Sequence, residues 1–145
     1  MSSSLDANVL IYASDESSRY YRKAVDFLGE RVEGSDLICL SWITIMAYQR
    51  ISTHPAIFRN PLSPAVAWGN ISRLLARPRV RVIGELPGFV REYEEVTSSF
   101  SVRGNHVPDA HLATILRQNG VKTIYTADAD FRKFRFLEVV DPFVG

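Results

Sequence analysis

The chain has 145 residues, of which 46% are hydrophobic and 23% are charged. This length and composition predict a single soluble globular domain with a sizeable core. The formal net charge of +1 excludes a protein that attracts nucleic acid through an overall basic field. Any surface that binds nucleic acid would therefore have to be a local patch.

The single cysteine, Cys39, excludes an intramolecular disulfide and a zinc site built from cysteines. No apolar run approaches the roughly 20 residues that a membrane helix needs. The first residues do not have the charged and then apolar pattern of a secretory leader. We therefore expect one cytoplasmic domain that covers residues 1–145 and makes no contact with a membrane.

Apolar runs alternate with helical periodicity along the chain. In chain order we expect a strand at 2–6, a helix at 20–32, a strand at 36–40, helices at 42–51 and 64–75, a strand at 80–83, helices at 89–99 and 108–119, a strand at 122–126, a short helical turn after it, and a strand at 137–140. We expect Ser41 and Ser63 to cap the helices at 42–51 and 64–75. The alternation of strands and helices predicts an α/β fold with three layers and a central, mainly parallel sheet. In open sheets of this kind, ligands bind beyond the carboxyl ends of the strands.

The stretch LDANVLIYA places Asp6 directly before an apolar group, where a carboxylate is costly to desolvate. One interpretation is that Asp6 caps a helix, since Asp is favoured at helix N-termini. The other is that Asp6 belongs to a metal or catalytic site. This stretch alone leaves both interpretations open.

Other acidic residues fall near the same edge of the predicted sheet. Asp128 and Asp130 follow the strand at 122–126, and Asp109 lies in the first turn of the helix before it. Like charges this close raise each other's pKa unless a cation neutralises them. Clusters of carboxylate oxygens suit Mg²⁺ or Mn²⁺, which can activate water and stabilise the charge that develops on a phosphodiester. The pattern indicates metal-dependent phosphodiester hydrolysis, although each acid alone could also be a helix-dipole or turn residue.

Three segments that contain the acidic residues occur in this order along the chain: LDANVLIYA, RGNHVPDAHLA and TADADF. Together they closely resemble the PIN-domain ribonucleases, specifically the VapC toxins of bacterial toxin–antitoxin pairs. THPAIFRNPLSPAVAW also resembles the loop and helix of one VapC subgroup, so that the resemblance extends from residue 5 to about residue 142. It implies a PIN-like fold and an endoribonuclease that uses Mg²⁺ or Mn²⁺ to cleave structured RNA such as tRNA or rRNA. It also implies a homodimer and a VapB-like antitoxin whose tail covers the active site, with an Arg placed among the carboxylates.

The resemblance assigns roles to individual residues. Asp6 and Asp109 would be the principal metal ligands, Asp128 would complete the acidic site, and Asp130 would lie close by. The polar residues Asn8, Thr126 and Asn105 would hold the site in shape. Arg50 and Arg103 neighbour these segments and are the candidates for contact with RNA phosphates. The three histidines lack metal-ligand spacing, and we expect them in surface or loop packing: His54, His106 and His111.

The chain departs from the family pattern at one position. The family usually has a Glu on the helix after the second strand, and by spacing from Trp42 that position is Ala47. Gln49 is two residues further on and points to another side of the helix. Either the Glu was replaced by design, to make a toxic nuclease tolerable to its host, or the alanine is natural and activity is reduced or lost. We expect weaker metal binding and an impaired enzyme in this chain.

Two other functions remain open on the sequence alone. One is a catalytically dead PIN fold that binds RNA or protein without cutting it. The other is a phosphatase that forms an aspartyl-phosphate on Asp6. Such a phosphatase prefers a second Asp where this chain has Asn8, and it usually needs a cap and a longer core.

Overall fold

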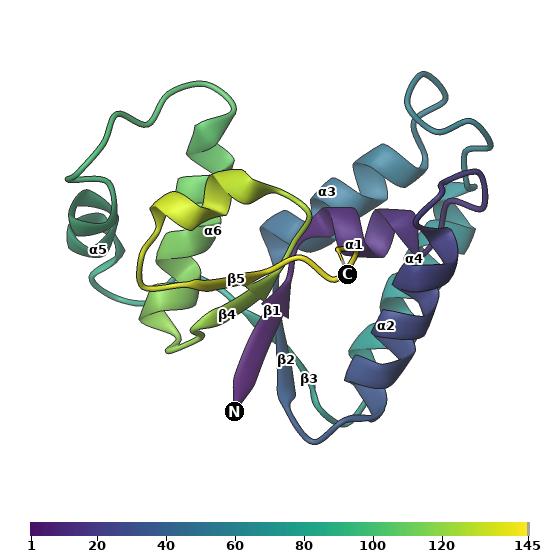
Figure 1. Cartoon of the computed structure of the whole chain (residues 1–145), viewed down its shortest axis with the longest axis horizontal. Helices are drawn as coiled ribbons and strands as arrows, with labels where there is room; N and C mark the ends of the chain where they lie inside the picture. The colour runs from purple at the N-terminus through teal and green to yellow at the C-terminus, as the bar shows by residue number, and fades with distance from the viewer. Residues whose placement is uncertain (145) are drawn as a thin grey trace.

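Five parallel strands form the central sheet of the computed structural model, which describes residues 1–144 (Figure 1). Their order across the sheet is β3-β2-β1-β4-β5, and each adjacent pair is parallel. The strands are β1 Ser2–Leu5, β2 Leu37–Ser41, β3 Val80–Ile83, β4 Thr123–Tyr125 and β5 Glu138–Val140. The predicted α/β architecture is confirmed, and the sheet is parallel throughout these strands rather than only mainly so.

Seven helices connect and cover the strands in the described part of the chain. They are α1 Ala7–Tyr12, α2 Tyr21–Glu33, α3 Trp42–Ser52, α4 Pro64–Leu75, α5 Phe89–Val96, α6 His106–Gln118 and the 3₁₀ helix η1 Ala129–Lys133. None of the helices within residues 1–144 combines the length and apolar character needed to cross a membrane.

Hydroxyl groups cap two of the predicted helices at the expected residues. Ser41 Oγ accepts a hydrogen bond from Thr44 N at 3.3 Å at the start of α3. Ser63 Oγ accepts one from Val66 N at 3.1 Å at the start of α4. Each cap pairs one of the amide groups that the first turn of a helix leaves without a partner.

Two helix boundaries differ from the sequence-based expectation by more than one residue. Helix α5 ends at Val96 instead of Ser99, and the hydroxyl of Thr97 donates to the carbonyl of Tyr93 at 2.8 Å. The Thr97 amide donates to the same carbonyl at 3.0 Å, so that the side chain and the backbone of Thr97 together close the last turn. Helix α6 begins at His106, two residues before Pro108, which is tolerated because the first turn needs no amide hydrogen there.

The helices form a layer on each face of the sheet (Figure 1). Helices α5 and α6 cover one face, where Cys39 of β2 and Ile124 of β4 join the core. Helices α1 to α4 cover the other face, where Ile38 and Leu40 of β2 are buried. Successive β2 side chains thus alternate between two cores, as the pleat of a strand requires. This three-layer arrangement brings the carboxyl ends of all five strands to one edge.

Candidate active site

The carboxyl ends of β1 and β4 lie side by side at this edge. Leu5 of β1 is in register with Tyr125 of β4. The next amide, that of Asp6, donates to the carbonyl of Tyr125 at 2.9 Å. The segment after β1 and the segment after β4 therefore start side by side, although Asp6 and Thr126 are 120 positions apart in the sequence.

Asp6 is the N-cap of α1 and also the centre of a polar network. Its Oδ1 accepts a hydrogen bond from Ala7 N at 2.8 Å. Its Oδ2 accepts one from Thr126 Oγ1 at 2.7 Å and a longer one from Asn8 Nδ2 at 3.2 Å. The capping interpretation of Asp6 is therefore right, and it is compatible with a second role at the site.

Thr126 and Asn8 connect Asp6 to the segment after β4. Thr126 is 1% exposed, and its hydroxyl accepts hydrogen bonds from Asn8 Nδ2 at 3.0 Å and from Asp128 N at 3.0 Å. The carbonyl oxygen of the Asn8 side chain accepts one from Ala127 N at 3.2 Å. Because one buried hydroxyl orders both the Asp6 carboxylate and the Asp128 backbone, the positions of these two acids are linked.

Asp128 and Asp130 have different places at the site. Asp128 caps η1 by accepting a hydrogen bond from Asp130 N at 2.9 Å. Asp128 raises the pKa of both Asp6 and Asp109. Asp130 is exposed, and its carboxylate lies 3.9 Å from His106 Nδ1. Asp130 therefore lies at the solvent-exposed border of the acidic cluster.

Asp109 lies half-buried in the first turn of α6. Burial, followed by the charges of Asp128 and Asp6, raises the pKa of Asp109 to about 6. Lys133 and His106 oppose that shift. Burial also raises the pKa of Asp6, against the hydrogen bonds from Thr126 and the Ala7 backbone. The structure thus brings Asp6, Asp109 and Asp128 within electrostatic reach of one another, across three separate segments.

The donor chemistry of this cluster fits a hard divalent cation. Within residues 1–144, no three Asp, Glu, His or Cys side chains lie close enough together to hold a metal ion. Mg²⁺ keeps several waters and commonly needs only one or two carboxylates from the protein. The raised pKa values of Asp6 and Asp109 show that ionising both is unfavourable, and a cation would relieve that cost. Asp6 and Asp109, with Asp128 beside them, could hold such an ion.

The position where the family resemblance predicts a Glu lies on a helix that contacts the two helices of Asp6 and Asp109. Ala47 is half-buried on α3, and α3 contacts both α1 and α6, whose N-terminal ends hold Asp6 and Asp109. Gln49 donates to the carbonyl of Pro64 at 3.2 Å, at the start of α4. Gln49 is thus engaged elsewhere and does not take the place of an acid at Ala47.

The remaining sequence candidates lie around this site with fewer contacts. Arg50 and Arg103 are both exposed, and Arg103 donates to Ser101 Oγ at 3.1 Å. Asn105 precedes α6, but its side chain makes no capping hydrogen bond. Gly104 has a φ of 58°, which is a left-handed conformation that favours glycine. The roles of Arg50, Arg103 and Asn105 stay predictions.

The histidines divide into two groups. His54 accepts a hydrogen bond from Ala56 N in a turn, and His111 lies 2.7 Å from Glu85, so both have the expected packing roles. His106 instead lies at the site, with its Nδ1 3.1 Å from Lys133 Nζ. Lys133 was not among the residues expected at the site, although FRKFRF, residues 131–136, alternates cations with aromatic rings directly after TADAD.

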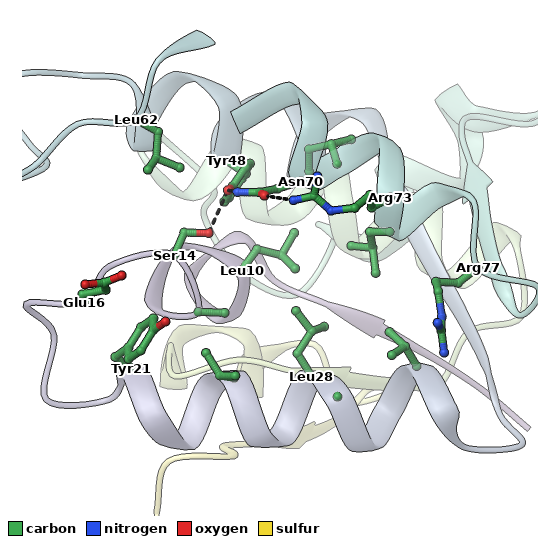
Figure 2. A pocket seen from close by; sticks show the side chains of 16 residues that line it. Leu10, Ser14, Glu16, Tyr21, Leu28, Tyr48, Leu62, Asn70, Arg73 and Arg77 are labelled. Carbon is green, nitrogen blue, oxygen red and sulfur yellow. Dashed lines mark hydrogen bonds between the residues drawn. The ribbon is translucent and has the colours of Figure 1, made fainter. Parts of the chain in front are cut away.

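A separate apolar groove of about 410 Å³ lies on the face covered by α1 to α4. Figure 2 shows Leu10 of α1 and Leu28 of α2 pointing into it. On its wall the hydroxyl of Tyr48 lies 2.8 Å from Ser14 Oγ and accepts a hydrogen bond from Asn70 at 3.0 Å. None of the three clustered carboxylates lines this groove.

Comparisons with known proteins agree with this geometry. The model of the PIN domain family matches residues 4–137. Ribonuclease VapC48 of Mycobacterium tuberculosis is 40% identical over 145 residues, which are 100% of each chain. Ribonuclease VapC43 of the same organism is 28% identical over 141 residues, 97% of this chain and 95% of that one.

Solved structures show the same fold. VapBC2 from Rickettsia felis, bound to a DNA fragment from its promoter, matches with a TM-score of 0.65, 17% identity and 96% and 97% coverage of this chain and that one. VapC20 of Mycobacterium tuberculosis, described as a toxin that cleaves the sarcin-ricin loop, matches with a TM-score of 0.65, 18% identity and 96% and 99% coverage. The chain belongs to the PIN-domain family and, within it, to the VapC ribonucleases of toxin–antitoxin pairs.

Proposed function

We propose that this chain is the toxin of its pair and cleaves structured RNA in a reaction that depends on Mg²⁺ or Mn²⁺. The observation that carries the proposal is the electrostatic coupling of Asp6, Asp109 and Asp128 at the strand edge. When bound there, a divalent cation would polarise the phosphodiester and lower the pKa of an attacking water.

The residues of the chain divide the remaining work. Thr126 and Asn8 orient the Asp6 carboxylate through hydrogen bonds of 2.7 and 3.2 Å. Asp109, with its pKa raised to about 6, would be held in its ionised form by a bound cation. Lys133 supplies a positive charge beside Asp109, where the backbone of an RNA strand would otherwise be repelled by the acids.

The substrate and partners are inferred from the family. We infer a tRNA or rRNA target cut at a displayed single-stranded loop, since unpaired bases there are accessible to a protein. We also infer an antitoxin of the VapB kind, whose Arg would pair with the carboxylates. The apolar groove of Figure 2 is the type of surface that protein partners cover, and it supports the presence of such a partner. A homodimer is the expected assembly of the toxin alone.

RNA cleavage tests the proposal directly. We would incubate total tRNA and rRNA with the chain and with Asp6→Asn and Asp109→Asn, in Mg²⁺, in Mn²⁺ and with a chelator. Asp26→Asn on the exposed surface of α2 is the matched control. Discrete cuts that require metal and both acids are the expected result. Cuts that survive the chelator or both substitutions would refute the assignment.

Ala47 favours a second candidate function, an RNA- or protein-binding PIN fold that does not cut. Loss of one acid removes a ligand or a water-orienting group, which costs roughly a hundredfold or more in comparable sites. RNA binding without cleavage in any metal, by both this chain and Ala47→Glu, would support that candidate. Residual Mn²⁺-dependent cleavage would instead indicate an impaired enzyme.

A further inference from the structure

A second hollow, of about 580 Å³, lies between the end of α5 and the connection from η1 to β5. We call it the η1 groove. Phe100 lines it from the α5 side, and Lys133, Arg135 and Phe136 line it from the η1 side. Figure 1 shows α5, α6 and η1 grouped at this end of the molecule. The resemblance to the VapC family assigns no role to these side chains.

Lys133 joins the η1 groove to the acidic cluster. Its Nζ lies 3.1 Å from His106 Nδ1, in the first turn of α6 that also holds Asp109. Its charge lowers the pKa of Asp109. The same ammonium lies 5.6 Å from the centre of the Phe100 ring, on the groove side. An RNA strand that runs from the acidic cluster along Lys133 would therefore enter the η1 groove.

The groove combines free positive charge with aromatic surface. Arg135 is exposed and Phe136 is half-exposed. Neither Lys133 nor Arg135 forms an ion pair with a carboxylate among the described residues. Arg117, by contrast, pairs with Glu92 at 3.0 Å and with Glu95 at 3.5 Å, so that its one positive charge on the groove wall offsets part of the negative charge of these two glutamates.

The charge extends beyond the groove itself. Arg135 also lines an adjoining hollow of about 310 Å³ together with Arg132. Lys133, Arg135 and Arg132 thus form a basic track that starts beside the acidic cluster. Sites for single-stranded nucleic acid have this composition, with cations along the backbone and aromatic rings against the bases. An acidic peptide would use the cations but would leave the ring faces without a matching group.

We propose that the η1 groove binds the single-stranded nucleotides next to the cleaved phosphate of the RNA. The phosphates would contact Lys133 and Arg135, and a base would stack on the accessible face of Phe136 or Phe100. This inference rests on the proposed function, since it extends the substrate path of that site. It assigns part of the RNA specificity to a surface outside the acidic cluster.

Equilibrium binding in the presence of a chelator tests the inference without requiring catalysis. The probe is a fluorescein-labelled ten-nucleotide oligouridylate, followed by fluorescence anisotropy. We would compare Arg135→Gln and Phe136→Leu with the matched controls Arg22→Gln on α2 and Phe89→Leu on α5, outside the groove. We expect each groove variant to weaken binding about five- to tenfold, as for loss of one stacked base or one phosphate contact. Both controls should bind like the parent.

The salt dependence separates the two groove variants. Arg135→Gln should reduce the slope of log affinity against log salt by about 0.7, the value for one phosphate contact on a single strand. Phe136→Leu should leave that slope unchanged, because it removes a ring and no charge. Thermal unfolding of each variant, within about 2 °C of the parent for exposed substitutions, shows that the fold is intact.

Three outcomes would overturn the inference: groove variants that bind as tightly as the parent, a parent that does not bind the oligonucleotide, and poly-glutamate that competes as well as RNA. These results leave the ribonuclease assignment to be decided by the metal-dependent cleavage assay. Conversely, weakened binding by the groove variants, with no cleavage in any metal, supports the groove and refutes the proposed nuclease function.

Discussion

Replacement of Asp109 by Asn should stabilise the protein at neutral pH and abolish cleavage. Burial and the charges of Asp128 and Asp6 raise the Asp109 pKa from 3.8 to about 6, so its ionised form is disfavoured in the folded state. A shift of this size corresponds to at most about 3 kcal/mol, which solvent screening at a half-exposed position reduces to about 1–2 kcal/mol. Loss of the favourable interaction between the Asp109 charge and the N-terminus of α6 reduces this gain in stability by about 0.5 kcal/mol. The net gain is about 1 kcal/mol, or about 3 °C in Tm for a chain of this size.

The pH dependence of this gain is the decisive readout. A carboxyl with a raised folded pKa destabilises the fold above that pKa and has no such effect below its unfolded pKa of 3.8. Differential scanning fluorimetry in a chelator at pH 7.5 and at pH 4 should therefore show a clearly larger gain in Tm for Asp109→Asn at pH 7.5 than at pH 4. Added Mg²⁺ should raise the Tm of the parent and not that of the variant. An equal Tm difference at both pH values, or a loss of stability at pH 7.5, would refute the electrostatic reasoning.

Three further predictions concern the same site. Thr126→Val should lower the free energy of unfolding by about 2–4 kcal/mol, because it removes the three hydrogen bonds of a buried hydroxyl and leaves the Asp128 amide without a partner. Denaturant titration against Thr114→Val measures the difference, since the Thr114 hydroxyl contacts only the helix carbonyl of Ala110. Mg²⁺ affinity should fall as the pH decreases through about 6, where Asp109 takes up its proton, and calorimetric titration at pH 5 and pH 7.5 checks this. Ala47→Glu should speed RNA cleavage about a hundredfold, measured side by side with this chain under the same metal conditions; equal rates would contradict the role given to the missing acid.

Much of the fold could be predicted from the sequence because its signals are local. Ser41 and Ser63 cap the helices that they were expected to cap. The short first strand, SSSLD, is rich in serine, a poor strand former, so it could be placed mainly through the residues after it; β1 ends at Leu5, one residue earlier than expected. Helix α1 was foreseen only in the capping interpretation of Asp6, because six residues are too few to show a clear period.

The carboxylates were predicted to converge because each lies directly after a strand or in the first turn of a helix. The cations beside them could not be placed in the same way. Phe131 and Phe134 are 1% exposed and three residues apart, which matches the three-residue turn of the 3₁₀ helix. Their burial turns Arg132 and Arg135 outward. The position of η1 over α6 then brings Lys133 to His106, a long-range contact that no local pattern encodes.

The origin of Ala47 can be separated from its effect by combining two observations. A glutamate codon in the genome together with faster cleavage by Ala47→Glu would mean that the acidic cluster needs its fourth member and that this chain was disabled. A natural alanine codon together with cleavage by this chain that Ala47→Glu does not speed would mean that three carboxylates and Lys133 form the complete site. That second case is physically consistent, because Lys133 already lowers the Asp109 pKa and fewer acids reduce the repulsion that a cation must offset. The Lys133→Gln variant then distinguishes the two cases. It should raise the Asp109 pKa in both, but it should impair cleavage by the alanine chain only if the three-acid site is active.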